Sequence, residues 1–179
     1  IDGNTVTGIT TMLMDAGWDT GDILLQAELP ISSDDTAGTL HDKLAELGAK
    51  VLLDTLKGLE AGTVRPKPQD HSAATYVRML KKEDAELDWD QPPKRVVDFV
   101  RGMQPWPVAY TFFGDRLVKI WKCKVLDNQQ IPDEESLVPG TVFGSDDQCI
   151  FVAVRGGAVG ILELQPENGR RMTGRDFLN

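Results

Sequence analysis

The sequence has 179 residues, of which 41% are hydrophobic and 26% are charged, and its formal net charge is -9 at pH 7. This length and composition suit a soluble globular protein with one substantial core or two small ones. No apolar run approaches the roughly 18 to 20 residues that a membrane span needs, so the composition excludes a membrane-spanning helix.

Two strand-like runs flank an acidic loop near the start of the chain. Residues 6–14 are rich in the Ile, Val and Thr that strands favour, and apolar and polar side chains alternate in residues 23–30, as in a half-buried strand. The short connection permits an antiparallel pair but no parallel crossover. The loop, residues 15–22, packs three carboxylates, a hydroxyl and two glycines into eight residues. Taken alone, such spacing is more often an acidic β-turn than a ligand site.

The segment 34–62 is predicted to form a helix. Two aspartates and Thr36 offer caps for its N-terminus, leucines recur on one apolar stripe, and Gly62 is placed to end it. Two strands and one helix do not bury both faces of a sheet, and the stripe needs a layer to cover. We therefore expect residues 1–62 to be the C-terminal part of an α/β domain whose opening strands would precede Ile1.

The rest of the chain reads as a linker followed by a second, largely β domain. Residues 63–80 begin with prolines and charges without periodicity, as linkers do. A strand-like run at 85–89 precedes a helix that is predicted from the prolines at 92 and 93 to about Gly102. From Val108 onward, short strands at about ten-residue spacing with turn signals indicate a small barrel or sandwich.

Charge and cysteine usage add two expectations. Residues 63–126 carry twelve basic and eight acidic residues, whereas both flanking segments are acidic. A basic middle is a mild indication of a polyanionic partner, although solvated surface charge is the commoner explanation. Cys123 and Cys149 lie in apolar stretches without metal-ligand spacing. We expect them to be buried and reduced, as in a cytoplasmic protein, and we expect no metal site.

Four stretches resemble one enzyme family. The loop region resembles the D-x-G-x-D-T-G-D loop of the formyltetrahydrofolate-dependent transferases, and three further stretches agree with that family in order, from about Thr7 to Asn179. Within the family they agree most with the branch that formylates methionine on initiator tRNA. The stretches are "MDAGWDTGDILLQAELPI", "LHDKLAELGAKVLLDTLKGLEAG", "TYVRMLKKEDAELDWDQP" and "LQPENGRRMTGRDFLN".

The resemblance implies a domain arrangement. Residues 1–62 would be the C-terminal part of a Rossmann-like catalytic domain, 63–80 a linker, and 81–179 an OB-fold-like barrel. The fold class is then an α/β remnant of a formyltransferase domain followed by a small all-β domain.

The resemblance also implies the chemistry of the acidic loop. A formyl group would pass from 10-formyltetrahydrofolate to an amine, which requires a donor for the developing oxyanion and groups that move the amine proton. In the family these roles belong to an Asn and a His of an N-x-H motif and to an Asp, which matches Asp19 here. Gly17, Thr20, Gly21 and Asp22 would belong to the folate pocket, although Asp22 is explained equally well as a turn cap.

Two basic pairs are candidates for contact with tRNA. Lys81 and Lys82 lie where the family presents basic residues to the tRNA acceptor arm, and Arg170 and Arg171 match a basic pair near its C-terminus. Contacts of this kind with phosphates set affinity and orientation without reading sequence. For each pair taken alone, a solvated surface is an equally good explanation.

This sequence also departs from the family pattern. No N-x-H occurs in it, the family's substrate loop is absent, and Trp18 stands where Leu is more usual. We therefore expect a C-terminal portion that is inactive by itself, within a cytoplasmic, monomeric enzyme that acts on initiator methionyl-tRNA. Another folate-dependent formyl hydrolase or a sugar-amine formyltransferase would share the loop. A bare RNA-binding module is a third alternative, although the barrel strands lack an evident aromatic stacking platform.

Overall fold

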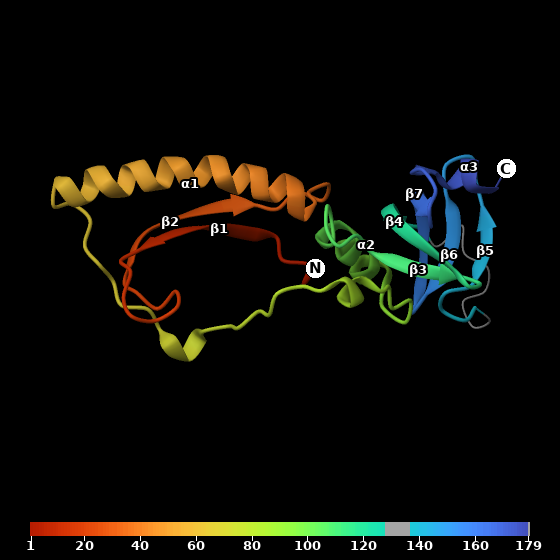
Figure 1. Cartoon of the computed structure of the whole chain (residues 1–179), viewed down its shortest axis with the longest axis horizontal. Coiled ribbons are helices and arrows are strands. Elements are labelled where there is room, and N and C mark those ends of the chain that lie inside the picture. The colour runs from red at the N-terminus through yellow and green to blue at the C-terminus, as the bar shows by residue number, and fades with distance from the viewer. Residues whose placement is uncertain (128–136, 179) are drawn as a thin grey trace. The chain divides into compact units, whose positions relative to one another are not determined.

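The computed structural model of the chain describes residues 1–127 and 137–178 (Figure 1). It divides into two compact units: residues 4–79 form one, and residues 80–179 together with 1–3 form the other. The predicted boundaries at residues 62 and 80 remain a prediction. The predicted domain 81–179 includes some residues that lie outside the described ones.

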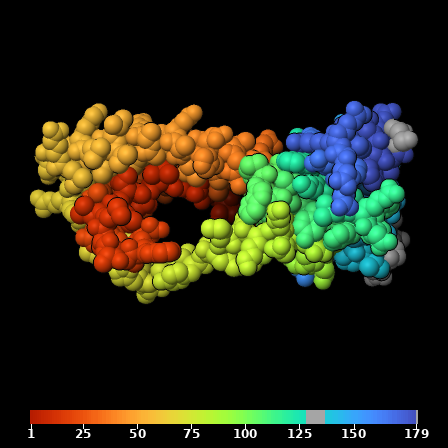
Figure 2. Space-filling model, viewed as in Figure 1, coloured from red at the N-terminus to blue at the C-terminus, as the bar shows by residue number. Residues whose placement is uncertain are grey.

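The first unit is built on an antiparallel strand pair. β1 (Val6–Met12) pairs with β2 (Ile23–Pro30), with a register shift between Thr11 and Met12. Both predicted strands and their antiparallel pairing are confirmed, and β1 ends two residues earlier than expected. The helix α1 (Ala37–Glu60) packs along both strands, and Figure 2 shows it lying on them as an orange ridge above red.

A capping box fixes the start of α1. The Thr36 hydroxyl accepts a hydrogen bond from the Thr39 N–H at 3.2 Å, and the Thr39 hydroxyl accepts one from the Thr36 N–H at 3.0 Å. Gly62, with φ of 66°, follows the end of the helix in the left-handed region. Val51 is buried against the strands, whereas four leucines of the helix are 39–58% exposed: Leu52, Leu53, Leu56 and Leu59.

The second unit is an antiparallel sheet curled into an open half-barrel. The strands follow the order β3-β4-β7-β6-β5, and β8 pairs with β7. The helix α2 packs on β4 and β7, so that Val96 and Val100 join the core of the sheet. The elements are η2 (Lys82–Ala85), α2 (Pro93–Gly102), β3 (Tyr110–Phe113), β4 (Arg116–Val125), β5 (Val142–Ser145), β6 (Ile150–Val154), β7 (Gly157–Pro166), β8 (Met172–Thr173) and α3 (Gly174–Leu178).

The strand predicted at 85–89 is wrong. The chain forms a short helical turn up to Ala85, and only Glu86 makes an isolated parallel bridge, to Tyr110. The Asp88 carboxylate then accepts a hydrogen bond from the Asp90 N–H at 2.9 Å. This local side-chain turn competes with sheet pairing and directs the chain into α2, whose predicted start and end are confirmed.

The two cysteines are buried and free, as expected. Burial raises the pKa of Cys123 to about 12 and that of Cys149 to about 11, so neither thiol is a nucleophile at neutral pH. Among the described helices, none is both long enough and apolar enough to cross a membrane.

Candidate active-site loop

The Asp15 side chain is hydrogen-bonded to other residues of the loop between β1 and β2. One oxygen of its carboxylate accepts hydrogen bonds from the Thr20 hydroxyl at 2.6 Å and from the Gly17 N–H at 3.0 Å. These two bonds, the Thr20 bond foremost, hold the pKa of Asp15 below its usual range. Asp15 is therefore the acid that caps this turn, the role that the sequence left open for Asp22.

Asp19 lies in the middle of the loop in an unusual main-chain conformation. Its φ of 55° lies in the left-handed region, which few residues other than Gly adopt and in which Asp is enriched. The side chain is exposed, and its carboxylate makes no hydrogen bond or ion pair with any residue that the structure describes. The loop thus presents an unusual backbone conformation together with an acid that is available to a ligand or to another part of an enzyme.

The two glycines are required by close approaches within the loop, to a side chain at Gly17 and to the main chain at Gly21. A Cβ at Gly21 would overlap the carbonyl oxygen of Leu13, and a Cβ at Gly17 would overlap the Thr20 hydroxyl. The Leu13 N–H also donates to the Asp22 carbonyl at 2.9 Å, which closes the base of the loop. The positions of the glycines in the loop motif are therefore explained by the packing of the loop itself. Asp22 contributes to that packing through its main-chain carbonyl.

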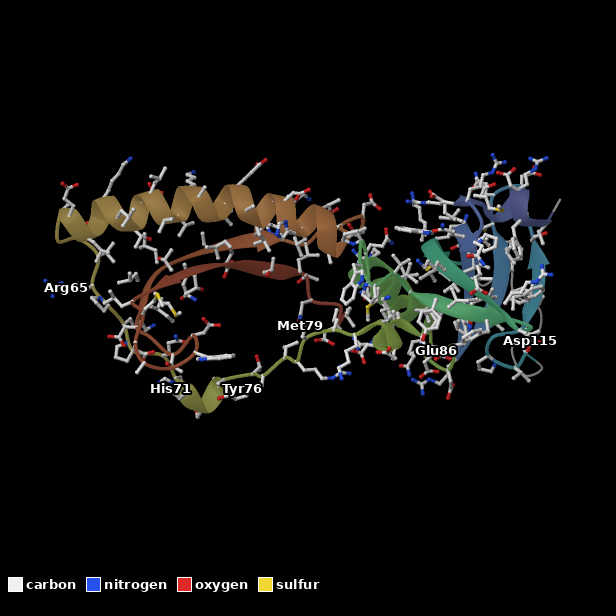
Figure 3. The ribbon with its side chains drawn as sticks, viewed as in Figure 1. Arg65, His71, Tyr76, Met79, Glu86 and Asp115 are labelled. Carbon is white, nitrogen blue, oxygen red and sulfur yellow. The ribbon has the colours of Figure 1, made fainter. Side chains whose placement is uncertain are left out.

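A returning segment touches the loop from outside. Lys67 exchanges two main-chain hydrogen bonds with Ile23, at 2.8 and 2.9 Å. The side-chain amide of Gln69 then donates to the carbonyls of Asp19 and Gly21. His71 follows at the start of the helical turn η1 (His71–Ala73), near the loop (Figure 3). The sequence showed only a linker here, because single hydrogen bonds to main-chain atoms leave no periodic signal.

The predicted tRNA-binding residues belong to the second unit and differ in availability. Lys81 and Lys82 are exposed at the start of η2. Arg170 is also exposed and has no ion pair with any described residue. Arg171 is engaged: its guanidinium pairs with Glu163 at 2.5 Å and stacks over the Trp121 ring, 4.6 Å from the centroid. A phosphate would have to compete with Glu163 for the guanidinium of Arg171, whereas Arg170 has no such described partner.

An apolar cavity of about 110 Å³ lies in the same unit. Its lining includes Trp89, Phe112, Phe113 and Phe177, and among the described residues that line it there is no titratable side chain and none of the predicted site residues. Among the described residues, no group of three His, Cys, Asp or Glu side chains could hold a metal ion.

The chain matches two known protein families along its length. Residues 79–179 match the family described as "Formyl transferase, C-terminal domain", and residues 1–56 match the family described as "Formyl transferase". A methionyl-tRNA formyltransferase of Acetivibrio thermocellus is 46% identical over 178 residues, which are 99% of this chain and 56% of the relative. The chain thus spans little more than half the length of that protein.

Two solved structures share the fold at low sequence identity. HypX from Aquifex aeolicus in complex with tetrahydrofolic acid matches 99% of this chain and 30% of its own, with a TM-score of 0.67 and 20% identity. The sugar 3N-formyl transferase WlaRD, in the presence of dTDP and 5-N-formyl-THF, matches 94% of this chain and 58% of its own, with a TM-score of 0.66 and 16% identity. Together with the family matches, they confirm the predicted fold class, an α/β part of a Rossmann-like formyltransferase domain followed by a small β-barrel domain.

Proposed function

This chain belongs to the formyl transferase family, and on that basis we propose that it is part of a methionyl-tRNA formyltransferase. The reaction would transfer the formyl group of 10-formyltetrahydrofolate to the amino group of methionine on initiator tRNA. The amine nitrogen bonds to the formyl carbon, the bond between that carbon and the folate nitrogen breaks, and the proton lost by the amine passes through a base to the leaving folate nitrogen. The 46% identity to the Acetivibrio thermocellus enzyme supports this substrate.

The observation that carries the proposal is the state of Asp19. The acid that the resemblance assigns to catalysis is also the one that the loop holds at a left-handed φ of 55° with its carboxylate free of described partners. A free carboxylate can orient a histidine and stabilise its imidazolium, as the third member of a catalytic triad does. In this proposal the histidine comes from the N-x-H motif of the family.

The folate and tRNA contacts follow from the same assignment. By the resemblance, the loop main chain at Gly17 and Gly21 and the side chains of Thr20 and Asp22 would border the folate pocket. That HypX was solved with tetrahydrofolic acid supports a folate site in this fold. Phosphates of the tRNA would be held in the second unit by Lys81, Lys82, Arg170 and Arg171.

The 179 residues alone should not catalyse the reaction. They contain Asp19 but no N-x-H, and therefore only one of the three catalytic side chains that the family uses. By complete enzyme we mean these residues joined to a segment that supplies the N-x-H pair.

The test is formyl transfer from 10-formyltetrahydrofolate by the complete enzyme to two acceptors, methionyl-tRNA and a dTDP-linked amino sugar. We expect transfer to the tRNA and none to the sugar, and no transfer by residues 1–179 alone. Transfer to the sugar would instead favour the reaction named for WlaRD. Turnover by the 179 residues alone would contradict the assignment of the missing Asn and His.

A further inference from the structure

Gln69 is hydrogen-bonded to the loop through its side-chain amide, and the two bonds flank Thr20. Its Nε2 donates to the main-chain carbonyl of Asp19 at 2.9 Å and to that of Gly21 at 2.6 Å. An amide NH2 carries two hydrogens, whereas the amide oxygen can only accept. Two carbonyl acceptors therefore fix which end of the amide faces the loop. We propose that Gln69 is a positioning residue that sets the direction of the Asp19 carboxylate, an inference that rests on the proposed catalytic role of Asp19.

The conformation of Asp19 requires such an external support. A non-glycine residue in the left-handed region persists only where its surroundings hold it there. Asp15 holds the loop from within, but its bonds end on Gly17 and Thr20 and do not involve the carbonyl of Asp19. The Gln69 amide supplies the restraint by holding the carbonyl of Asp19 itself. If it were removed, this carbonyl could turn toward water, and the carboxylate on the same residue would turn with it.

Gln69 can provide this restraint because its own segment is anchored to β2 just before it and ordered by a local turn just after it. Before it, Lys67 is bonded to Ile23 through the main chain in both directions. After it, the Asp70 carboxylate accepts hydrogen bonds from the Ser72 N–H at 3.0 Å and from the Ser72 hydroxyl at 2.6 Å. A substitution at Gln69 therefore removes the two bonds to the loop and leaves the segment that carries them in place.

The first experiment compares Gln69→Ala and Gln69→Glu with a matched control in the complete enzyme. Glu has the shape of Gln but, when ionised, no hydrogen to donate, so it would face two carbonyl oxygens as an anion. The control is Gln26→Glu, the same change at an exposed side chain whose amide donates to the Thr10 hydroxyl at 3.2 Å. We expect kcat to fall roughly 10- to 100-fold in both Gln69 variants, the range for a misplaced catalytic group. The KM for methionyl-tRNA should change little, and the control should match wild type.

The second experiment asks whether Gln69 acts through Asp19. In an Asp19→Asn background, Gln69→Ala should lower kcat no further, because the group it positions is already disabled. In the 179-residue chain, amide hydrogen exchange of the loop should become faster in Gln69→Ala, while the melting temperature stays close to wild type. Losses that multiply in the double variant would overturn the proposal, as would a Gln69→Ala enzyme with wild-type kcat.

These outcomes are separable from failure of the proposed function. If Asp19→Asn impairs formyl transfer and Gln69→Ala does not, the positioning role is wrong and the function stands. If the wild-type enzyme does not formylate methionyl-tRNA, the function is wrong. In that case loop exchange in the 179-residue chain still decides whether Gln69 holds the loop.

Discussion

At the scale of single residues, the three acids of the loop have distinct environments. Asp15 accepts two hydrogen bonds and orders the turn, Asp22 contributes its carbonyl to the base of the loop, and Asp19 is the acid in the left-handed region, with a carboxylate that makes no hydrogen bond to any described residue. The sequence could single out Asp19 only by resemblance, since all three lie within eight positions. It could not assign the capping role, because the partner of Asp15 depends on how the loop folds back on Thr20.

Asp19→Asn keeps the shape of the side chain and removes the charge that would stabilise an imidazolium. In the complete enzyme we expect turnover to fall by at least about 100-fold, with tRNA affinity and melting temperature nearly unchanged, since no described residue depends on this carboxylate. Asp22→Asn should have a small effect, and Asp15→Asn should act by loosening the loop. Steady-state kinetics of the three variants, measured side by side, test this prediction. If Asp19→Asn retained turnover within a few-fold of wild type, Asp19 would have only a structural role in the turn.

Adjacent arginines should behave differently toward tRNA. Arg170→Ala should make the dependence of tRNA affinity on salt shallower by about one unit per lost phosphate contact. Arg171→Ala should change this slope less, because its guanidinium is already paired with Glu163 and stacked on Trp121. It should instead lower the melting temperature of the barrel. Binding titrations at several salt concentrations are the measurement, with Lys81→Ala and Lys82→Ala expected to follow Arg170→Ala. An unchanged slope in Arg170→Ala would make that residue ordinary solvated surface.

At the scale of elements, the N-terminus of α1 was predicted from its caps, but its charge network was not. Asp35 lies just before the helix, and its buried carboxylate accepts from Lys43 at 2.7 Å, from the Ser32 N–H at 2.9 Å and from the Thr39 hydroxyl at 2.9 Å. These bonds, the Lys43 bond first, lower the pKa of Asp35 to about 2. Periodicity identifies the apolar side of a helix, whereas such a network depends on a chain reversal between residues 32 and 35 that has no period.

Asp35 should make the stability of the first unit depend on pH. Because its pKa is lower in the folded state than its ordinary value of about 3.9, its contribution is fully present above that value and is lost as the pH falls toward 2. Asp35→Asn should lower the melting temperature of α1 near neutral pH, and the gap from wild type should narrow as the pH falls. Circular dichroism melts between about pH 5 and about pH 2 measure this. Asp54→Asn, on the exposed face of the same helix, is the control. A gap that stayed constant across this range would exclude the network as its source.

At the scale of the whole molecule, burial is very uneven between the two units. Among the described residues, Val51 is the one buried hydrophobic side chain of the first unit, while the second unit contains a continuous core that includes Val96, Val159 and Ile161. Composition and alternation predicted the strands of the first unit, and regular spacing with turn signals predicted those of the second. The leucine stripe also predicted that α1 needs more cover than β1 and β2 provide, and the exposed leucines agree with this expectation. The strand pairing order of the barrel could not be predicted, because it depends on contacts between distant segments.

The 179-residue chain should therefore unfold in two steps. The first unit buries little apolar surface, and that surface is the main source of stability. Amides of α1 and β2 should exchange with solvent well before those of β6 and β7, and calorimetry should show an early transition of low enthalpy before the main one. A single transition, with exchange equally slow in α1 and β7, would show that the first unit gains stability from a source other than its own core.

The lack of room at Gly21 restricts how this sequence can drift over evolutionary time. Any other amino acid would place a Cβ against the Leu13 carbonyl. A substitution at this position therefore cannot change ligand specificity without rebuilding the loop. Trp18, three residues earlier, is 97% exposed and accepts change at little structural cost. New specificities among descendants of this protein should therefore arise at position 18, while position 21 remains glycine.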